Sequence, residues 1–180
     1  MVARHLLVAV IVGWTISGML VFHPSSVSAD EIEIEKAKGL IKAAEVLSSR
    51  SHYLEALDHL WEARLVLKQI REDNTQLYAD LMFLTAETKI KGRRHQDFPA
   101  SYVKSALKDI KIANRLRKRN PKILPQRLAK GYFLEGYIQK WFFMRNKKAL
   151  ECFRECVKVD SSHAACKREL SDLLVKRENE

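Results

Sequence analysis

The chain has 180 residues, of which 47% are hydrophobic and 30% charged, with 6 glycines, 4 prolines and 3 cysteines. This composition excludes collagen-like, low-complexity and disulfide-dense mini-protein classes. The formal net charge of +10 is uneven, because residues 30–87 carry 12 acidic and 7 basic side chains, whereas residues 89–148 carry 18 basic and 3 acidic ones. A field of this kind attracts anionic partners and does not determine the fold.

Residues 1–29 have the features of a secretory signal peptide. They carry one basic side chain, Arg4, no acidic one, and a mostly apolar run over residues 6–21. Val27 and Ala29 then place small residues where a signal peptidase cleaves. The run is shorter than the roughly 20 residues that a membrane span needs, so an uncleaved anchor is the less favoured alternative. We therefore expect residues 30–180 to form one domain in the periplasm or another extracytoplasmic compartment, where nucleic acid is not the expected partner.

Helical periodicity runs through nearly all of the remaining chain, and no alternating run of strand length stands out. Turn and capping residues divide it into seven expected helices, at residues 31–48, 52–71, 75–91, 101–119, 124–143, 147–159 and 162–178. Because short connectors make consecutive helices antiparallel neighbours, the expected fold is all-α, a short array of helical hairpins with a C-terminal capping helix. The expected buried face of that last helix comprises Ala165, Leu170, Leu173 and Leu174.

One pattern recurs in the second, fourth and sixth expected helices: a small residue, a large apolar residue four positions later, and a small residue three positions after that. The instances are Ala56/Leu60/Ala63, Ala106/Ile110/Ala113 and Ala149/Phe153/Cys156. Each set lies on one helix face, where the small residues let a paired helix come close. Together with the segments Ser51–Ala63 and Lys148–Asp160, this pattern resembles the tetratricopeptide repeat (TPR) family. The resemblance covers residues 34–178 and implies an array that recognises protein partners by surface area and charge.

The spacing of the pattern departs from this family. Ala56 and Ala106 are 50 residues apart, and Ala106 and Ala149 are 43 apart, whereas a TPR unit has about 34 residues. We expect longer helices and the connector at residues 92–100 to absorb the excess. A generic array of helical hairpins is the alternative interpretation.

The three cysteines, Cys152, Cys156 and Cys166, predict one disulfide and one spare thiol if the compartment is oxidising. Cys156 falls nearly opposite Cys166 across the turn at residues 160–162, which makes this pair the expected disulfide. A metal site formed by the three cysteines with His163 is less favoured, because their spacing does not match the usual zinc-binding pairs. No cofactor motif or catalytic motif occurs, so a metal-dependent enzyme is the least favoured class, and we expect no cofactor.

The candidate partner site combines the connector after the third expected helix with a basic belt on the fourth. Belt residues recur every three or four positions and therefore share one helix face. Long connectors are often functional, and arginine forms forked pairs with carboxylates. The expected partner-binding residues are Arg93, Arg94, Phe98 as an apolar anchor, Lys104, Lys108, Lys111 and Arg115. A solvated basic face and a disordered insertion are the alternatives to this interpretation.

These features predict an exported adaptor or scaffold that holds acidic protein partners as an accessory or assembly subunit of a larger extracytoplasmic complex. The alternative is a basic module that binds an anionic polymer or a membrane surface without spanning it. A stripe of aromatic residues, Phe133, Tyr137 and Trp141, is expected to lie mainly in the core. It is the second candidate site if the basic belt does not bind the partner.

Overall fold

The computed structural model describes residues 28–95 and 97–178, and these residues form seven helices without a strand. The expected signal peptide lies outside the described residues apart from Ser28 and Ala29. The helices are α1 (Ala29–Ser49), α2 (Tyr53–Gln69), α3 (Gln76–Arg94), α4 (Ser101–Arg119), α5 (Pro125–Trp141), α6 (Asn146–Val159) and α7 (Ala164–Glu178). Among them, no helix is both long enough and apolar enough to cross a bilayer.

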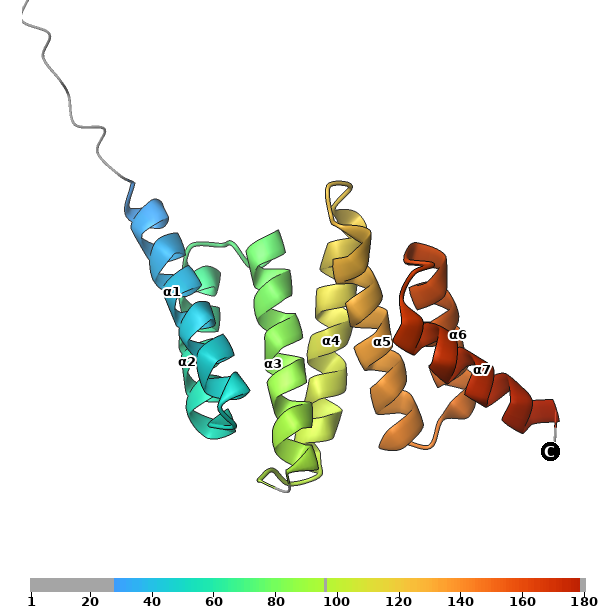
Figure 1. The fold of residues 1–180 in the computed structure, drawn as a ribbon. Helices are drawn as coiled ribbons and strands as arrows, with labels where there is room; N and C mark the ends of the chain where they lie inside the picture. The colour runs from blue at the N-terminus through green and yellow to red at the C-terminus, as the bar shows by residue number, and fades with distance from the viewer. Residues whose placement is uncertain (1–27, 96, 179–180) are drawn as a thin grey trace, which may run out of the picture.

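The helices follow one another in a row of antiparallel hairpins (Figure 1). α1 packs most extensively on α2, α3 on α4, and α5 on α6, while smaller contacts join successive hairpins and α7 packs on α6. Because α3 also contacts α1 and α5, the odd-numbered helices form one layer and α2, α4 and α6 form the other. The fold is the expected all-α array of hairpins with a C-terminal capping helix.

The start of α1 shows how local sequence sets a helix end. Ser28 Oγ accepts a hydrogen bond from the Glu31 backbone N–H at 3.2 Å, and the Glu31 carboxylate accepts one from the Ser28 N–H at 2.9 Å. This reciprocal capping box satisfies two backbone donors that the first helical turn leaves unpaired. Cleavage after Ala29, which remains a prediction, would remove this cap.

The recurring small-large-small pattern forms the core of the array. Eight of its nine members are 0% exposed and Leu60 is 1% exposed. The small residues bring the paired helices together, and the large residue of each set fills the space between them. In the last hairpin a glycine also allows close packing, because a Cβ on Gly136 would lie only 2.7 Å from the Phe153 ring.

The connector between α3 and α4 differs from the expected one. α3 continues to Arg94 instead of ending near residue 91, and α3 and α4 each have 19 residues, so helix length absorbs much of the excess in the repeat. The Asp97 N–H bonds the Gly92 carbonyl at 3.0 Å. Phe98 is only 2% exposed and packs near Tyr53 and Tyr102, with ring centroids 6.3 and 4.6 Å away. The prediction of Phe98 as a surface anchor is therefore wrong.

α7 begins at Ala164 instead of residue 162, because Asp160 organises a turn first. Its carboxylate accepts hydrogen bonds from the N–H and Oγ of Ser162 at 2.9 and 2.6 Å, and these bonds lower the pKa of Asp160. On α7, Leu173 is buried, and Leu170, Leu174 and Ala165 are partly buried, as expected.

Candidate partner-binding surface

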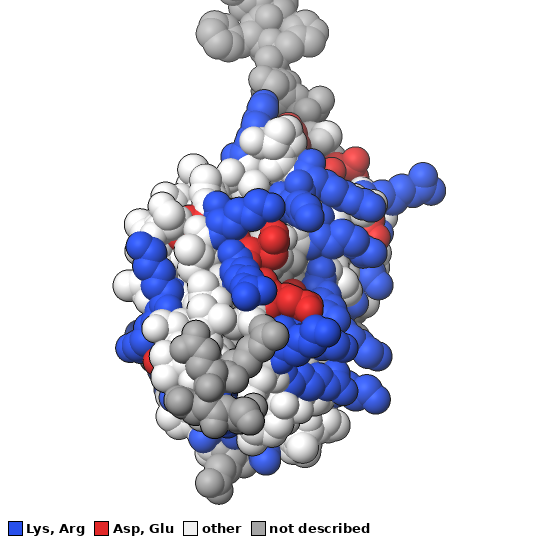
Figure 2. All heavy atoms as spheres, turned by 90° about the vertical axis from the view of Figure 1, so that its right-hand side faces the viewer, with Lys and Arg blue, Asp and Glu red and all other residues white. Residues whose placement is uncertain are grey.

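One face of α4 carries a row of exposed bases. We call it the basic stripe; its members are Lys104, Lys108, Lys111, Arg115 and Lys118. Their spacing places them on one side of the helix, over a length of about 21 Å at 1.5 Å per residue. Within the part of the chain that the structure describes, none of the five makes an ion pair. Figure 2 shows the array of helices end-on from the α7 side, with Lys and Arg gathered along one flank of the molecule.

The structure separates the other bases of the expected site from this stripe. Arg93 is half-buried and donates a hydrogen bond to the Phe98 carbonyl at 3.1 Å. The Arg94 guanidinium lies 6.0 Å from the centre of the Tyr137 ring on α5, so it faces the next hairpin. The structure therefore brings Lys104, Lys108, Lys111 and Arg115 together, but Arg93, Arg94 and Phe98 do not join them.

Arg117 of α4 is turned inward and belongs to the packing of three helices. It is 3% exposed, pairs with Asp80 of α3 at 2.8 Å, and donates to the Arg127 carbonyl of α5 at 2.9 Å. Burial lowers the pKa of Arg117, while the hydrogen bond to Asp80 opposes that change. Asp80 also pairs with the Arg127 side chain at 2.7 Å. Breaking a buried pair on one side is strongly destabilising, so Arg117 acts in the fold and is not available to a partner.

The equivalent face of α2 carries apolar side chains. Counted from the first small residue of each repeat, the equivalent pairs are Leu54 and Lys104, Trp61 and Lys111, and Leu65 and Arg115. Leu54, Trp61 and Leu65 are 61%, 64% and 40% exposed, and we call them the apolar row. The sequence analysis missed this row, although aligning the repeats would have shown that it occupies the same positions as the exposed bases of α4.

A groove lies between α2 and α4, and we call it the outer groove. Its volume is about 490 Å³, and α3 forms its floor. The lining residues are Leu57, Asp58, Leu60, Trp61 and Arg64 of α2, Thr85 and Lys89 of α3, and Ser101, Tyr102 and Ser105 of α4.

Both cations in the outer groove already have partners in the fold. Lys89 Nζ lies 2.6 Å from Asp109 Oδ2 and 2.8 Å from Ser105 Oγ, and Arg64 Nε donates to Tyr78 Oη at 3.1 Å. Lys89 is therefore neutralised inside the fold. The groove presents mainly apolar carbon beside Trp61, and its α4 side is formed by Ser101, Tyr102 and Ser105, which are not members of the basic stripe.

A partly buried polar cluster lies between α4, α5 and α6. Asn114 Nδ2 donates to Glu135 Oε2 at 2.9 Å. Burial raises the pKa of Glu135, and the hydrogen bond from Asn114 opposes that rise. Burial, followed by the negative charge of Glu135, raises the pKa of Cys152 to about 12, and burial also raises the pKa of Tyr132. At neutral pH the Cys152 thiol is protonated, a state that makes a poor nucleophile and a poor metal ligand.

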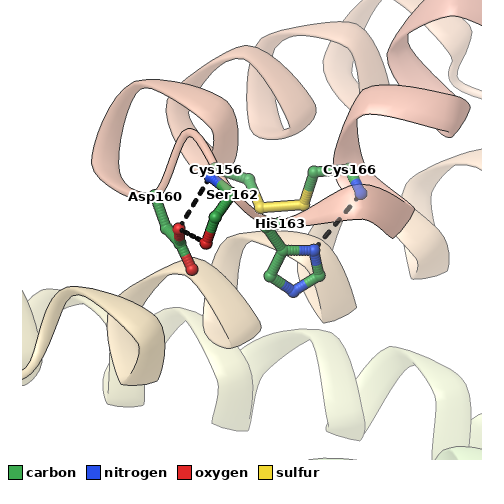
Figure 3. Close-up of a disulfide and its surroundings, with 5 residues drawn as sticks. All are labelled: Cys156, Asp160, Ser162, His163 and Cys166. Carbon is green, nitrogen blue, oxygen red and sulfur yellow. Dashed lines mark hydrogen bonds between the residues drawn. A yellow bond between two sulfur atoms is a disulfide. The ribbon is translucent and has the colours of Figure 1, made fainter.

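The structure joins Cys156 of α6 to Cys166 of α7 in a disulfide, the pair that the sequence placed across the turn (Figure 3). The Cα atoms are 6.3 Å apart. His163 lies beside the two sulfurs, and its Nδ1 accepts a hydrogen bond from the Cys166 N–H at 3.3 Å. Donor atoms of Cys156, His163 and Cys166 lie within 4.8 Å of one another, but Cys152 is not in this group. While the sulfurs are bonded to each other, they are not thiolate ligands for a metal.

The aromatic stripe of α5 changes character along its length. Phe133 is half-buried and lies 6.1 Å from the Phe153 ring and 5.4 Å from the His163 ring, measured between centroids. Tyr137 is half-buried, and Trp141 is 51% exposed. The stripe is thus part of the packing at Phe133 and reaches the surface at Trp141.

The same fold occurs in a solved structure described as the first TPR of Spaghetti (RPAP3) bound to the HSP90 peptide SRMEEVD. The TM-score is 0.60 at 14% sequence identity, and the match covers 80% of this chain and 94% of that one. No family model and no curated protein matches the chain. At this identity the likeness concerns the fold alone, and it agrees with the three hairpins and their buried small residues: the chain is a TPR-like helical array.

Proposed function

We propose that this protein is an adaptor that holds an acidic segment of a protein partner against the basic stripe of α4. The observation that carries the proposal is the set of five exposed bases without an ion pair among the described residues. Like charges at three- and four-residue spacing destabilise a helix. An acidic partner would relieve that repulsion and gain binding energy from it.

The fold supports a protein partner. Stacked helical hairpins offer an extended surface on which a partner is recognised by area and charge. The TPR domain with the same fold was solved with a peptide whose sequence, SRMEEVD, contains three acidic residues. These properties favour binding over catalysis as the role of the chain.

Two observations support an extracytoplasmic location, where we propose that the protein is an accessory or assembly subunit of a larger complex. Residues 1–29 have the composition of a signal peptide. The Cys156–Cys166 disulfide is of a kind that persists mainly in oxidising compartments. A secreted adaptor of this size would act by holding a partner in position.

An anionic polymer or membrane surface is the competing partner, because it would also bind an unpaired basic stripe. Three probes distinguish these partners: a fluorescent deca-glutamate peptide, inorganic polyphosphate, and vesicles that contain phosphatidylglycerol. For an adaptor of acidic protein segments, we expect the peptide to bind with an affinity that falls as salt rises. Retention on vesicles or polyphosphate without peptide binding would support the competing function.

Two quadruple variants that remove the same amount of charge test where the peptide binds. Replacing Lys104, Lys108, Lys111 and Arg115 by glutamine should weaken deca-glutamate binding at least about tenfold at low salt and flatten its salt dependence. The control replaces Lys42, Arg50, Lys122 and Lys167, which are exposed and scattered, and it removes the same charge. If both quadruple variants lose the same affinity, net charge and not the basic stripe governs binding.

A further inference from the structure

We propose that the connector between α5 and α6 docks this protein on an anionic membrane surface. We call residues 141–145, with the sequence Trp-Phe-Phe-Met-Arg, the aromatic tip. It lies at the end of the array that also carries the connector between α3 and α4 (Figure 1). The inference goes beyond the proposed function and does not depend on it, because the aromatic tip and the basic stripe share no residue.

The aromatic tip exposes apolar side chains that the core does not use. Met144 is 76% exposed, the highest value among the large hydrophobic side chains of the described residues, and Trp141 is 51% exposed. Phe142 and Phe143 are half-buried and pack against the main core, so they fix the tip to the fold. The tip is therefore a supported projection with Trp141 and Met144 on its outside.

The backbone at Met144 shows that the fold does not require an apolar residue there. Met144 has a φ of 54°, in the left-handed region that favours glycine. Ser51 occupies the equivalent position, five residues before the first small residue of its repeat, and has a φ of 67°. Because a serine serves in the same conformation, an exposed methionine at this position indicates a contact outside the chain.

Unpaired bases surround the aromatic tip. The Arg145 guanidinium lies 5.0 Å from the centre of the Phe143 ring, and Arg94 reaches the neighbouring ring on α5 from the end of α3. Lys147 and Lys148 follow in the first turn of α6. Within the part of the chain that the structure describes, none of these four bases makes an ion pair.

Three of these bases lie where the helix itself disfavours them. The N-terminus of a helix carries partial positive charge, so acids and not bases stabilise its first turn. Arg145 is the N-cap of α6, Lys147 and Lys148 follow it, and the first turn holds no acid. Lys140, by contrast, pairs with Glu169 at 2.7 Å and serves the fold. The positive charge at the start of α6 does not serve the fold in this way, and it suits a surface that meets anionic headgroups.

An anionic bilayer fits this small projection better than a protein partner does. A stable protein interface buries about 800 Å² on each partner, whereas one aromatic side chain supplies at most about 250 Å², and only Trp141 and Met144 project here. A lipid surface requires no matching shape. Tryptophan favours the membrane interface because its ring is apolar with a polar edge, and flanking bases then meet the headgroups.

The test uses residues 28–180, which hold all seven helices and the cap of α1, so that the apolar run at residues 6–21 does not itself bind lipid. Trp61→Phe leaves Trp141 as the single tryptophan of this chain. The probes are vesicles of phosphatidylcholine and vesicles that also contain phosphatidylglycerol. We expect the anionic vesicles to bind at least about tenfold more tightly, with an affinity that falls as salt rises, and to shift Trp141 emission to shorter wavelength.

Met144→Gly separates the contact with lipid from folding. Glycine is favoured at positive φ, so the variant should unfold at the same temperature as the parent or higher, while its affinity for anionic vesicles falls about tenfold. Leu124→Gly is the matched control. Leu124 is 58% exposed and lies in the connector between α4 and α5, at the opposite end of the array, so this variant should bind vesicles as the parent does.

Two triple variants separate this inference from the proposed function. Each removes two lysines and one arginine, from beside the aromatic tip in the first and from the basic stripe in the second. The substitutions to glutamine are at Arg145, Lys147 and Lys148 in the first and at Lys108, Lys111 and Arg115 in the second. At physiological salt, where charges more than about 8 Å apart are largely screened, the first should weaken only vesicle binding, about tenfold, and the second only deca-glutamate binding.

Three results would overturn the inference. Anionic vesicles that do not bind, or that bind without a shift in Trp141 emission, would show that the aromatic tip does not enter lipid. If the second triple variant lost vesicle binding as much as the first or more, the basic stripe or net charge would govern the membrane contact. A shift of Trp141 emission with deca-glutamate but not with vesicles would assign the tip to the protein partner. In each case, deca-glutamate binding decides the proposed function separately.

Discussion

At the residue scale, Gly92 is required because the connector folds back onto α3. A Cβ on Gly92 would overlap the Phe98 ring, which is buried, whereas a Cβ on Gly39 in α1 would meet nothing within 4 Å. Replacing glycine by alanine inside a helix is worth roughly 1 kcal/mol in favour of the folded state. Crowding a packed core costs roughly 1–3 kcal/mol. The change in the free energy of unfolding on substitution by alanine is therefore governed by packing at Gly92 and by backbone freedom at Gly39.

We therefore expect Gly92→Ala to lower the free energy of unfolding and Gly39→Ala to raise it by up to about 1 kcal/mol. Urea denaturation of the two variants beside the parent protein measures both changes. If Gly92→Ala stabilised the protein as much as Gly39→Ala, Phe98 would not pack against α3 as the structure shows.

The chemistry of Cys152 gives a second expectation at this scale. Burial raises its pKa to about 12, so at pH 8 the folded protein holds almost no thiolate. We expect alkylation of Cys152 to be on the order of a hundredfold slower than that of an unfolded cysteine, and urea should abolish the difference. Mass spectrometry of the labelled protein measures the rate, with Cys152→Ser as the unlabelled control.

The raised pKa of Cys152 also determines the direction in which protein stability changes with pH. The folded pKa of Cys152 lies above its unfolded value of about 9, so the unfolded chain loses this proton first as pH rises. The contribution of the thiol to stability is complete below about pH 8 and is lost progressively between about pH 9 and 12. Alkylation of the folded protein at pH 8 as fast as in urea would show that Cys152 is exposed.

At the element scale, the helices follow from local pattern, and the partners of their charged residues do not. Three- and four-residue spacing predicted every helix, and the small-large-small pattern identified the packed faces, because both are properties of a single helix. Lys89 and Arg117 are two examples, because each pairs with a carboxylate on another helix. Their acidic partners lie 20 and 37 residues away in the sequence, a separation that helical periodicity does not encode.

The same distinction applies to the candidate site, where the sequence predicted residues that share one helix face and missed those that depend on several helices. Lys104, Lys108, Lys111 and Arg115 were found because one helix face carries them all. Phe98 was misplaced because its burial depends on Gly92 and on Tyr53 of another hairpin. The outer groove requires α2, α3 and α4 together, so no single segment predicts it.

The basic stripe should carry a measurable cost in stability. Lys108 lies one helical turn from both Lys104 and Lys111, and like charges at this spacing repel. Lys108→Glu replaces that repulsion by attraction, so we expect it to raise the free energy of unfolding by about 0.5–1 kcal/mol at low salt. Lys108→Gln, which only removes the repulsion, should give about half of that gain.

Thermal unfolding at low salt and at 1 M NaCl measures this effect, because high salt screens exposed charges. The gain of Lys108→Glu should disappear in 1 M NaCl, and the variant should bind deca-glutamate more weakly. A variant that is no more stable than the parent at low salt would indicate that the repulsion is already relieved within the chain.

At the scale of the whole molecule, the array is held together by contacts between neighbours. Asp80, Arg117 and Arg127 join α3, α4 and α5, and Lys140 of α5 pairs with Glu169 of α7 at 2.7 Å. In a row of repeats, stability is close to a sum of each hairpin and its interfaces. The end of the row therefore depends on whatever fastens α7, which has a neighbour on one side only.

The Cys156–Cys166 disulfide is the covalent part of that fastening, and its closed loop spans only 10 residues of sequence. A loop of this length contributes roughly 2–3 kcal/mol by restricting the unfolded chain. Replacing both cysteines by alanine should cost about this much without a packing defect at residue 156, because alanine occupies the equivalent positions Ala63 and Ala113.

We expect the loss to be local, because only α6 and α7 lie within the closed loop. In the Cys156→Ala, Cys166→Ala variant, amide hydrogen exchange should accelerate in α7 and at the end of α6, while α1 to α4 keep the protection of the parent. Cys152→Ser, which leaves the disulfide intact, is the control. An equal acceleration in all seven helices would mean that the array unfolds as one unit, and the disulfide would then stabilise the basic stripe on α4 from the far end of the molecule.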